Sequence, residues 1–488
     1  MPKRTTALEL VLAPRDPGDS ATRWLCTALR AEILEGRLRP GARLPATRDL
    51  ARQYRLSRGT IVSAFEQLTG EGYLEARVGS GTYVSQVLRE GARPPGRRVP
   101  TGSTARYRVS ELGRRVRALP GYELRPTRAF RANMPALDLF PITLWAQLTA
   151  RRLRRATPHQ LLGCDTIGYR PLREAVAGYL IGSRGVRCEP DQVVIVSGLQ
   201  EALDLVARVL VEPGQRVCVE DPGYDGAVLA FEASGARVTG VAVDAEGMEI
   251  PGPATRGARL AYVTPGHQFP LGITMSLRRR LALLAWARQA GALLVEDDYD
   301  SEFRYASRPV PTLQGLDRHG LVLLCGTFSK VLFPSLRLGY LVVPEGLVER
   351  FSAVKSVSRG HSPLLDQAVL SDFIAAGHFG RHVRRMRDVY AERLGVLLES
   401  AQRHLAGALD IMAVEAGLQT AALLEPGRDA AAVSRGAAAK QVEVVPLSTY
   451  ARLPLARDGL QLGFAAVDPQ EIRRGVSVLA AALEEARS

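Results

Sequence analysis

Two ionisable side chains of opposite charge follow apolar segments that have the composition of strands. Asp297 comes just after the segment 293–295, and Lys330 comes shortly after the segment 321–324. A lysine amine can form a Schiff base with a carbonyl compound, and a carboxylate in a poorly solvated site favours a cation beside it. The pair therefore indicates imine chemistry next to a group that carries a positive charge.

Groups that suit an anion surround this lysine in the sequence. Thr327 and Ser329 precede it and Arg337 follows it, and the fork of an arginine can bind a phosphate through two hydrogen bonds. Residues 197–200, Ser-Gly-Leu-Gln, join the apolar segment 193–196 to a helical pattern, and the N–H groups of a helix N-terminus bind phosphate. These groups predict a site for a phosphate dianion.

Aromatic residues complete the set that pyridoxal 5′-phosphate (PLP) requires: an imine lysine, an acid at the pyridine nitrogen, a phosphate site and a ring that covers the cofactor. Tyr224 is expected to lie on the cofactor ring, while Tyr299 and the His267-Gln268 corner are expected to bond its phenolic oxygen. No metal site is predicted, because the 7 histidines and 5 cysteines show no ligand spacing. The predicted cofactor-binding residues are Ser197, Gly198, Leu199, Gln200, Tyr224, Gln268, Asp297, Tyr299, Thr327, Ser329, Lys330 and Arg337.

The elements that must position these residues alternate between short apolar strands and helix-length stretches. This alternation predicts an α/β domain with a mostly parallel sheet and helices on both faces. The predicted strands are residues 193–196, 216–219, 260–263, 293–295 and 321–324.

The net charge of +14 is concentrated at the start of the chain. Residues 1–125 hold 23 Lys and Arg against 12 Asp and Glu, a net charge of +11 (counted from the sequence). A basic module beside a nearly neutral one is typical of nucleic-acid binding, although a basic solubilising tail would show the same charge.

Local patterns in this basic part predict a winged helix-turn-helix. Leu25, Leu29 and Ile33 form one apolar helix face that Gly36 ends, and Thr47 is expected to cap a short second helix. Ser57 is expected to cap a third helix, whose N-terminal residues Ser57, Arg58 and Thr60 can reach DNA bases and phosphates. The apolar face of that helix is Ile61, Ala64, Phe65 and Leu68, and residues 73–77 and 82–84 flank a Gly-containing hairpin tip.

The amino-acid sequences of three segments resemble those of the GntR family of bacterial regulators. They are residues 38–51 (Leu-Arg-Pro-Gly-Ala-Arg-Leu-Pro-Ala-Thr-Arg-Asp-Leu-Ala), 56–60 (Leu-Ser-Arg-Gly-Thr) and 79–84 (Gly-Ser-Gly-Thr-Tyr-Val). The resemblance implies that Arg48 and Arg58 contact DNA with help from Thr60. It also implies that Gly79 lets the wing approach the minor groove.

The composition changes after this module. Residues 87–124 are rich in arginine, glycine and proline and poor in apolar side chains, which predicts a basic flexible linker. A short helix is expected near residues 110–119 within it. The expected domains are a GntR-type DNA-binding domain at 17–86, this linker, and a PLP-binding effector domain at 125–488.

The PLP residues, in their order, resemble those of fold type I aminotransferases over residues 126–488. Together with the segments 264–272 and 297–305, the fusion resembles MocR/GabR-type regulators. The resemblance implies a multidomain protein in which a winged helix-turn-helix precedes an aminotransferase-like domain with a smaller C-terminal α+β subdomain. It also implies a homodimer.

Two positions depart from the aminotransferase pattern. Cys164 stands where the family often has a tyrosine that reaches the phosphate of the partner subunit, and Tyr169 is the alternative for that contact. Gln461 stands where active enzymes usually carry an arginine that binds the substrate carboxylate. Arg452 is the expected substitute for binding an effector carboxylate or sulfonate, with a surface charge as the alternative interpretation.

The expected function is transcription regulation: a small amine or amino-acid-like effector forms an external aldimine with PLP held on Lys330, and binding to double-stranded operator DNA changes. One alternative is a working aminotransferase with an accessory DNA-binding domain, and another is a constitutive DNA binder whose second domain is inactive. No apolar run reaches the roughly 18–20 residues of a membrane span, and no apolar segment follows the basic start, so a cytoplasmic protein without a membrane partner is expected.

Overall fold

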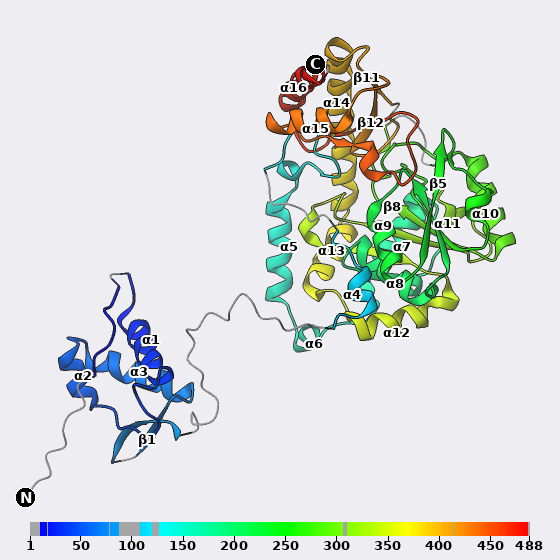
Figure 1. Cartoon of the computed structure of the whole chain (residues 1–488). Helices are drawn as coiled ribbons and strands as arrows, with labels where there is room; N and C mark the ends of the chain where they lie inside the picture. The colour runs from blue at the N-terminus through cyan, green and yellow to red at the C-terminus, as the bar shows by residue number, and fades with distance from the viewer. Residues whose placement is uncertain are drawn as a thin grey trace, which may run out of the picture. The chain divides into compact units, whose positions relative to one another are not determined.

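The computed structural model describes residues 10–16, 18–77, 79–86, 108–119, 126–305, 310–412 and 414–486. The chain divides into two compact units, Met1–Arg108 and Val109–Ser488, which Figure 1 draws. Most of the predicted linker, residues 87–107 and 120–124, lies outside the described residues. Between these two stretches is the short exposed helix α4 (Glu111–Arg115), which Ser110 caps. Within the described residues, no helix is long and apolar enough to cross a membrane.

The N-terminal unit has the predicted order of three helices and a hairpin. The elements are α1 (Ala21–Leu34), α2 (Thr47–Gln53), α3 (Arg58–Gly70), β1 (Leu74–Arg77) and β2 (Gly81–Val84). Leu25, Leu29 and Ile61 are among the side chains buried where α1 packs on α3. The prediction that Thr47 caps α2 is wrong: Ala46 is the last extended residue before the helix, so Thr47 already has helical backbone and no side chain caps this end.

The C-terminal unit is built on an eight-stranded sheet with the order β3-β10-β9-β8-β7-β4-β5-β6. The five central strands, β9 to β5 in that order, run parallel, while β10 and β6 are antiparallel to their neighbours. The predicted strands are all present, but β5, β6 and β10 were not predicted. The bounds are β3 (Val193–Val196), β4 (Arg216–Asp221), β5 (Arg237–Asp244), β6 (Gly247–Met248), β7 (Ala258–Val263), β8 (Leu293–Asp298), β9 (Val322–Thr327) and β10 (Gly339–Val342).

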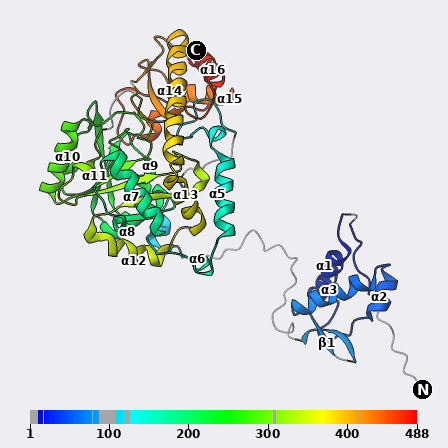
Figure 2. The same ribbon diagram turned by 180° about the vertical axis from the view of Figure 1, so that it is seen from behind.

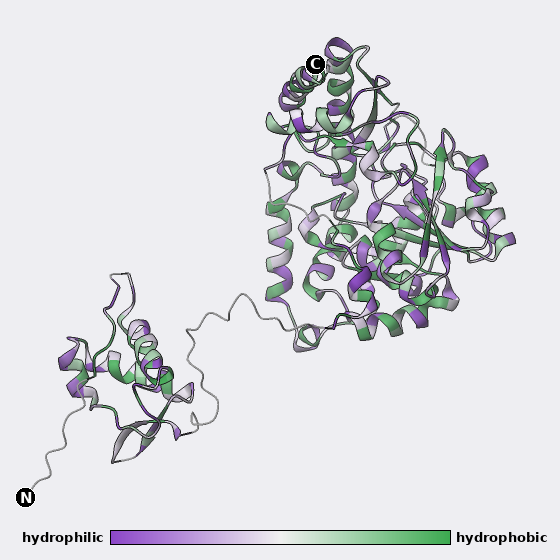
Figure 3. Cartoon of the chain, in the orientation of Figure 1, coloured by the Kyte–Doolittle hydropathy of each residue, from purple (hydrophilic) through white to green (hydrophobic). Residues whose placement is uncertain are grey.

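Helices cover both faces of this sheet, as Figures 1 and 2 show from opposite sides. On one face, α8 (Leu199–Leu210), α9 (Asp225–Ala233) and α12 (Val348–Ser358) pack on buried strand residues such as Val194 and Leu323. On the other face, buried strand residues such as Leu324 and Val322 pack on a second set of helices, which are α7 (Arg170–Arg184), α10 (Leu277–Ala290) and α13 (Leu364–Ala375). The remaining helices before the C-terminal part are α5 (Ile142–Arg154), α6 (Pro158–Leu162) and α11 (Leu313–Leu316). Figure 3 shows the alternation of hydrophobic and hydrophilic residues along α5, which is typical of a helix with one face packed on the core.

A second, four-stranded sheet forms the smaller C-terminal part, gathered at one end of the unit in Figure 1. Its strand order is β11-β12-β14-β13, and every pair is antiparallel. The elements are α14 (His378–His404), β11 (Leu409–Ile411), β12 (Gln419–Leu424), α15 (Ala430–Ala439), β13 (Val445–Pro446), β14 (Gly459–Gly463) and α16 (Pro469–Glu485).

Candidate functional site

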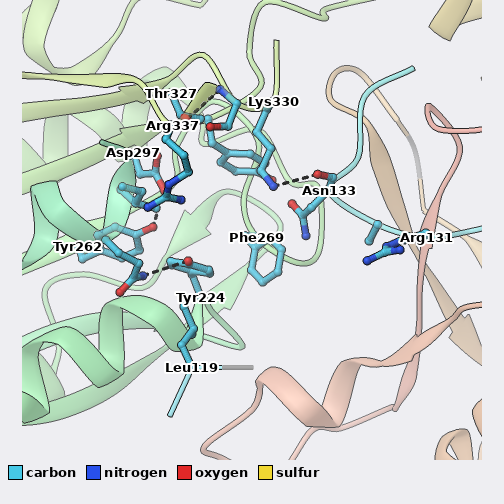
Figure 4. A pocket seen from close by; sticks show the side chains of 16 residues that line it. Leu119, Arg131, Asn133, Tyr224, Tyr262, Phe269, Asp297, Thr327, Lys330 and Arg337 are labelled. Atoms are coloured by element: carbon cyan, nitrogen blue, oxygen red, sulfur yellow. Dashed lines mark hydrogen bonds between the residues drawn. The ribbon is translucent and has the colours of Figure 1, made fainter. Parts of the chain in front are cut away.

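A cavity of about 450 Å³ lies at the carboxyl ends of the parallel strands of the large sheet. Ten of the twelve predicted cofactor residues line it, and the two that do not are Ser197 and Gln268. Figure 4 shows Asp297, Thr327 and Arg337 on one side and Asn133 and Arg131 on the other, with Lys330 between them. The fold therefore brings the acid, the lysine and the anion-binding groups into one space.

Lys330 reaches across the cavity from the end of β9. Its Nζ atom donates a hydrogen bond to the backbone carbonyl of Asn133 at 2.9 Å. The Thr327 hydroxyl accepts a hydrogen bond from the Ser329 N–H at 3.1 Å, which fixes the turn before the lysine. The lysine amine is thus held in the cavity.

Asp297 is buried within β8, which extends beyond its predicted end at Val295 to Asp298. Its Oδ2 atom accepts a hydrogen bond from the Tyr262 hydroxyl at 2.6 Å. Burial raises the pKa of Asp297 to about 7, and this hydrogen bond acts in the opposite direction. A carboxyl group in this setting is ionised most readily when a cation lies against it, which is what a protonated pyridine nitrogen supplies.

The anion-binding side of the cavity combines a helix N-terminus with a guanidinium group. Gly198 precedes α8 with a φ of 131°, a backbone conformation that favours glycine. A Cβ atom at this position would lie 3.7 Å from Nη1 of Arg337, so the guanidinium group is close to the start of the helix. Ser197 does not line the cavity. Its hydroxyl donates a hydrogen bond to Glu201 at 2.5 Å, and Glu201 forms a buried ion pair with Lys355 at 2.8 Å.

The aromatic side chains lie around the same space. The Tyr224 hydroxyl accepts a hydrogen bond from Gln200 at 3.1 Å, and its ring meets the Phe269 ring edge-on. The Tyr299 hydroxyl lies 3.1 Å from Nδ1 of His267. Gln268 is buried away from the cavity, because its amide nitrogen donates to the carbonyls of Pro222 and Phe269 and so holds their loop together.

The predicted DNA-contacting residues lie at exposed positions of the N-terminal unit, apart from Thr60, which is half-buried. The Arg48 and Arg58 side chains are exposed on α2 and at the start of α3. Ser57 caps α3 by accepting from the Thr60 N–H at 3.0 Å, and the two hydroxyls lie 2.8 Å apart. Gly79, at the tip of the β1–β2 hairpin, has a φ of 70°. This is the arrangement of a recognition helix and a wing.

Comparison with known proteins assigns a family to each unit. Residues 24–84 match the model of bacterial regulatory proteins of the gntR family, and residues 132–479 match aminotransferase class I and II. The probable rhizopine catabolism regulatory protein MocR of Rhizobium meliloti is 40% identical over 476 residues, which cover 97% of this chain and 96% of that protein. The chain belongs to the MocR-type regulators of the GntR family.

Other relatives of this MocR-type regulator agree with that assignment. The transcriptional regulator TauR of Rhodobacter capsulatus is 34% identical, covering 76% of this chain and 77% of its own. Among solved structures, the α-aminoadipate aminotransferase LysN of Thermus thermophilus, complexed with a phosphopyridoxyl compound, has a TM-score of 0.70 at 29% identity. That match covers 78% of this chain and 98% of the LysN chain. The protein is therefore a transcription regulator with a DNA-binding winged helix and a PLP-dependent, aminotransferase-like domain.

The structure does not bring Arg452 to the cavity of the regulator. Its guanidinium group pairs with Glu232 at 3.1 Å, and its backbone N–H donates to Asp221. Arg131 and Asn133 line the cavity instead, and sequence reasoning missed both, because they lie in a short irregular segment without a motif. Tyr262 was missed as well, although its place near the end of the predicted strand 260–263 was a signal for it.

The buried carboxyl groups of the C-terminal unit predict how the stability of the cofactor-free regulator depends on pH. Burial raises the pKa of Glu220, Glu296, Asp297 and Glu302 to about 7 each. The folded state then binds more protons than the unfolded state between about pH 4 and 7, so the free energy of unfolding falls as pH rises through this window. The melting temperature is expected to be lower at pH 8 than at pH 5.5.

Asp297→Asn is the matched variant for this prediction, because it removes one of these titrations. Its melting temperature is expected to fall less over the same range, and the difference corresponds to about 2 kcal/mol, because the range begins about 1.5 pH units below a pKa of about 7 (~1.4 kcal/mol per unit). Differential scanning calorimetry measures both proteins. If the melting temperatures of the variant and the wild type fall equally with pH, Asp297 does not contribute to the pH dependence of stability and this prediction is wrong.

Proposed function

We propose that this regulator senses a primary amine through PLP bound to Lys330, and that the amine changes its binding to operator DNA. The observation that carries the proposal is that Lys330, Asp297 and Arg337 line one cavity in a chain that also has a winged helix. Since the regulator acts on DNA, its proposed place of action is the bacterial cytoplasm.

The residues of the cavity suit each part of the cofactor. When bound, PLP supplies an aldehyde carbon that amines attack and a pyridine ring that withdraws electrons once it is protonated. Asp297 would hold the ring nitrogen in its protonated form, and Arg337 with the N–H groups of residues 198–200 would hold the phosphate. Thr327 and Ser329 would add donors beside the phosphate, while Tyr224 would cover the ring and Tyr299 would bond its phenolic oxygen.

Lys330 links the cavity to the small C-terminal sheet through Asn133. The carbonyl of Asn133 accepts from Lys330, and the N–H of Asn133 donates to Oε1 of Gln419 on β12 at 2.8 Å. A lysine released by an effector amine is free to strengthen its bond to this carbonyl. The effector then shifts the protein only as far as its affinities for the two arrangements differ.

The proposed assembly is a homodimer that places two winged helices on paired half-sites. Two linked heads bind more tightly than one, because the second contact forms at a high effective concentration. The proposed DNA contacts are Arg48, Ser57, Arg58, Thr60 and Gly79.

A titration of the full-length regulator with a panel of primary amines tests the proposal. An amine that is sensed should change the visible absorbance of the PLP-loaded protein and, over the same concentration range, its affinity for operator DNA. Secondary and tertiary amines of similar size are the control, because they cannot replace a lysine amine in an imine. If no primary amine changes both signals together, the proposal is wrong.

The same samples distinguish a regulator from an aminotransferase. An enzyme would convert the amine and an added keto acid over many turnovers, whereas a sensor is expected to give less than about one turnover per site on the time scale of binding. Gln461 favours the sensor, because the position lacks the arginine that binds a substrate carboxylate.

A further inference from the structure

Residues 129–133 run from the small sheet to the wall of the cavity. The carbonyl of Ala129 accepts a hydrogen bond from the Glu443 N–H at 3.0 Å, and the carbonyl of Phe130 accepts one from the Gly463 N–H at 2.9 Å. The next three residues line the cavity. The small sheet therefore determines where these residues meet the cavity.

The backbone on both sides of Arg131 has an unfavourable conformation. Phe130 has a φ of 66° and Asn133 has a φ of 62°, in the left-handed region that a bulky residue such as phenylalanine rarely adopts. The Phe130 side chain is 1% exposed, so the core of the C-terminal unit holds it in place. Residues in such conformations persist where the surrounding structure imposes them, and they are concentrated at functional sites. The strain therefore points to a functional role for the segment between these two residues.

The charged side chains that line the cavity have different uses once PLP is bound. Among the described lining residues, the cations are Arg131, Lys330 and Arg337, and the acid is Asp297. In the proposed complex Arg337 binds the phosphate, Lys330 forms the imine and Asp297 faces the pyridine nitrogen. Figure 4 shows Arg131 on the opposite side of Lys330 from Arg337. The charge of Arg131 therefore lies in the part of the cavity away from the proposed phosphate site.

The lysine amine lies against the same segment. Nζ of Lys330 donates to the carbonyl of Asn133 at 2.9 Å, and Asn133 is two residues from Arg131 in the cavity wall. An effector amine that replaces the lysine amine is therefore expected to lie beside this wall. A group carried by the same effector can then reach the Arg131 guanidinium group within the cavity.

Glu443 contacts Arg131 but is not among the described residues that line the cavity. Nε of Arg131 and Oε2 of Glu443 are 3.7 Å apart, and the buried Oε2 atom accepts no hydrogen bond from the described residues. The two charges therefore attract each other without the short hydrogen bonds, of about 2.7–2.9 Å, that make a guanidinium–carboxylate pair strong. Because a guanidinium group has several N–H donors, it can bind a second carboxylate in the cavity while Glu443 stays in contact.

Two other residues that could be expected to bind an effector anion do not serve this role. Arg452 pairs with Glu232, and Gln461 is uncharged and accepts a hydrogen bond from the Tyr450 hydroxyl. Neither Arg452 nor Gln461 is among the described residues that line the cavity. Arg131 is therefore the cation of the described cavity wall that is placed to bind an effector anion.

The planar fork of a guanidinium group matches the two oxygens of a carboxylate. We propose that the effector is an amine that carries a carboxylate, and that Arg131 binds this carboxylate while Glu443 limits how tightly it does so. The limit arises because the Glu443 carboxylate lies against the same guanidinium group, and like charges repel. This inference rests on the proposed amine sensing at Lys330 and names the class of amine together with the residue that selects it.

A series of amino acids and their amides forms matched pairs of probes, because an amide has nearly the shape of a carboxylate without its charge. The acids are glycine, 3-aminopropanoate, 4-aminobutanoate and 5-aminopentanoate, which differ in the number of carbons between the two groups. Each probe is titrated into the PLP-loaded full-length regulator, and binding is measured by cofactor absorbance and by calorimetry. For at least one spacing, the acid is expected to bind at least about tenfold more tightly than its amide, because charge-assisted hydrogen bonds are roughly twice as strong as neutral ones.

Arg131→Gln should remove this preference by lowering the affinity for the acid to that for the amide. Arg288→Gln makes the same substitution at an exposed position of α10 and should leave the preference unchanged. Glu443→Gln should increase the preference, because it removes the carboxylate that competes for Arg131. A merely structural role would not give these opposite effects, since loss of folding weakens the binding of both probes alike.

The outcomes separate this inference from the proposed function. If every amide binds the wild-type protein as tightly as its acid, or if Arg131→Gln keeps the preference, the inference is wrong while amine sensing stands. If Glu443→Gln lowers the preference, Glu443 does not limit carboxylate binding and that part of the inference is wrong. If no probe and no other primary amine changes the cofactor absorbance, amine sensing itself is wrong and the inference falls with it. The comparison of acids with amides on the wild-type protein stands without the variants if Arg131→Gln does not fold.

Discussion

Replacing Lys330 with alanine is expected to abolish the response of operator binding to the effector while leaving operator binding itself intact. The substitution removes the amine that bonds Asn133 and that would bind PLP covalently. It changes nothing in the N-terminal unit, which has its own buried core. The cofactor should remain only through noncovalent contacts, so its affinity should fall by a factor of a hundred or more, on the order of 3 kcal/mol.

Three measurements check this result. The visible absorbance of the bound cofactor should lose its imine band, mass spectrometry after borohydride reduction should show no adduct, and fluorescence anisotropy should give the same operator affinity with and without amine. Lys440→Ala is the matched control, because Lys440 is a partly exposed lysine that pairs with Glu485 far along the chain from the site. A normal effector response in the Lys330→Ala protein would show that sensing does not depend on this lysine.

The chemistry of the site could be predicted from the sequence because its central residues follow strand ends. A strand is visible as a short apolar run, and the carboxyl ends of parallel strands meet at one edge of a sheet. The runs before Asp297 and Lys330 therefore predict that the two residues lie near each other. The turn at Gly198 could also be predicted from the sequence, since a glycine between a strand and a helix is typical of a phosphate-binding loop.

The far wall of the cavity could not be predicted, because long-range packing builds it. Asn133 and Gln419 are 286 residues apart and meet through a hydrogen bond from the Asn133 N–H to the Gln419 side chain. No local sequence pattern predicts such a contact. For the same reason the prediction for Gln268 assigned its amide to the cofactor, whereas neighbouring carbonyls occupy it.

The missed strands have a local explanation. β10 has only four residues and is antiparallel to both neighbours, so it is not part of the alternation of parallel strands and helices from which the other strands were predicted. β5 contains Gly240, which interrupts its apolar pattern. The structure accounts for this glycine, because a Cβ atom there would lie 2.3 Å from Oδ2 of Asp221.

Replacing Arg58 with alanine is expected to weaken operator binding about tenfold to a hundredfold, because a base contact by an arginine contributes ~1–3 kcal/mol. Arg58 is exposed at the first position of α3, where a recognition helix meets base edges. The Ser57 cap, which fixes the helix start, does not involve the Arg58 side chain. The loss should therefore come from DNA contacts and leave the melting temperature nearly unchanged.

The salt dependence of binding shows which kind of contact is lost. If Arg58 reads a base, Arg58→Ala should reduce discrimination between the operator and a scrambled duplex. If it contacts only a phosphate, binding to both duplexes should weaken alike, and the slope of log affinity against log salt should fall by about 1. Arg37→Ala is the control within the same unit, because Glu32 and Glu35 already pair with this arginine. Equal losses for Arg37→Ala and Arg58→Ala would mean that the unit binds through its overall charge, and α3 would then not be the reading element.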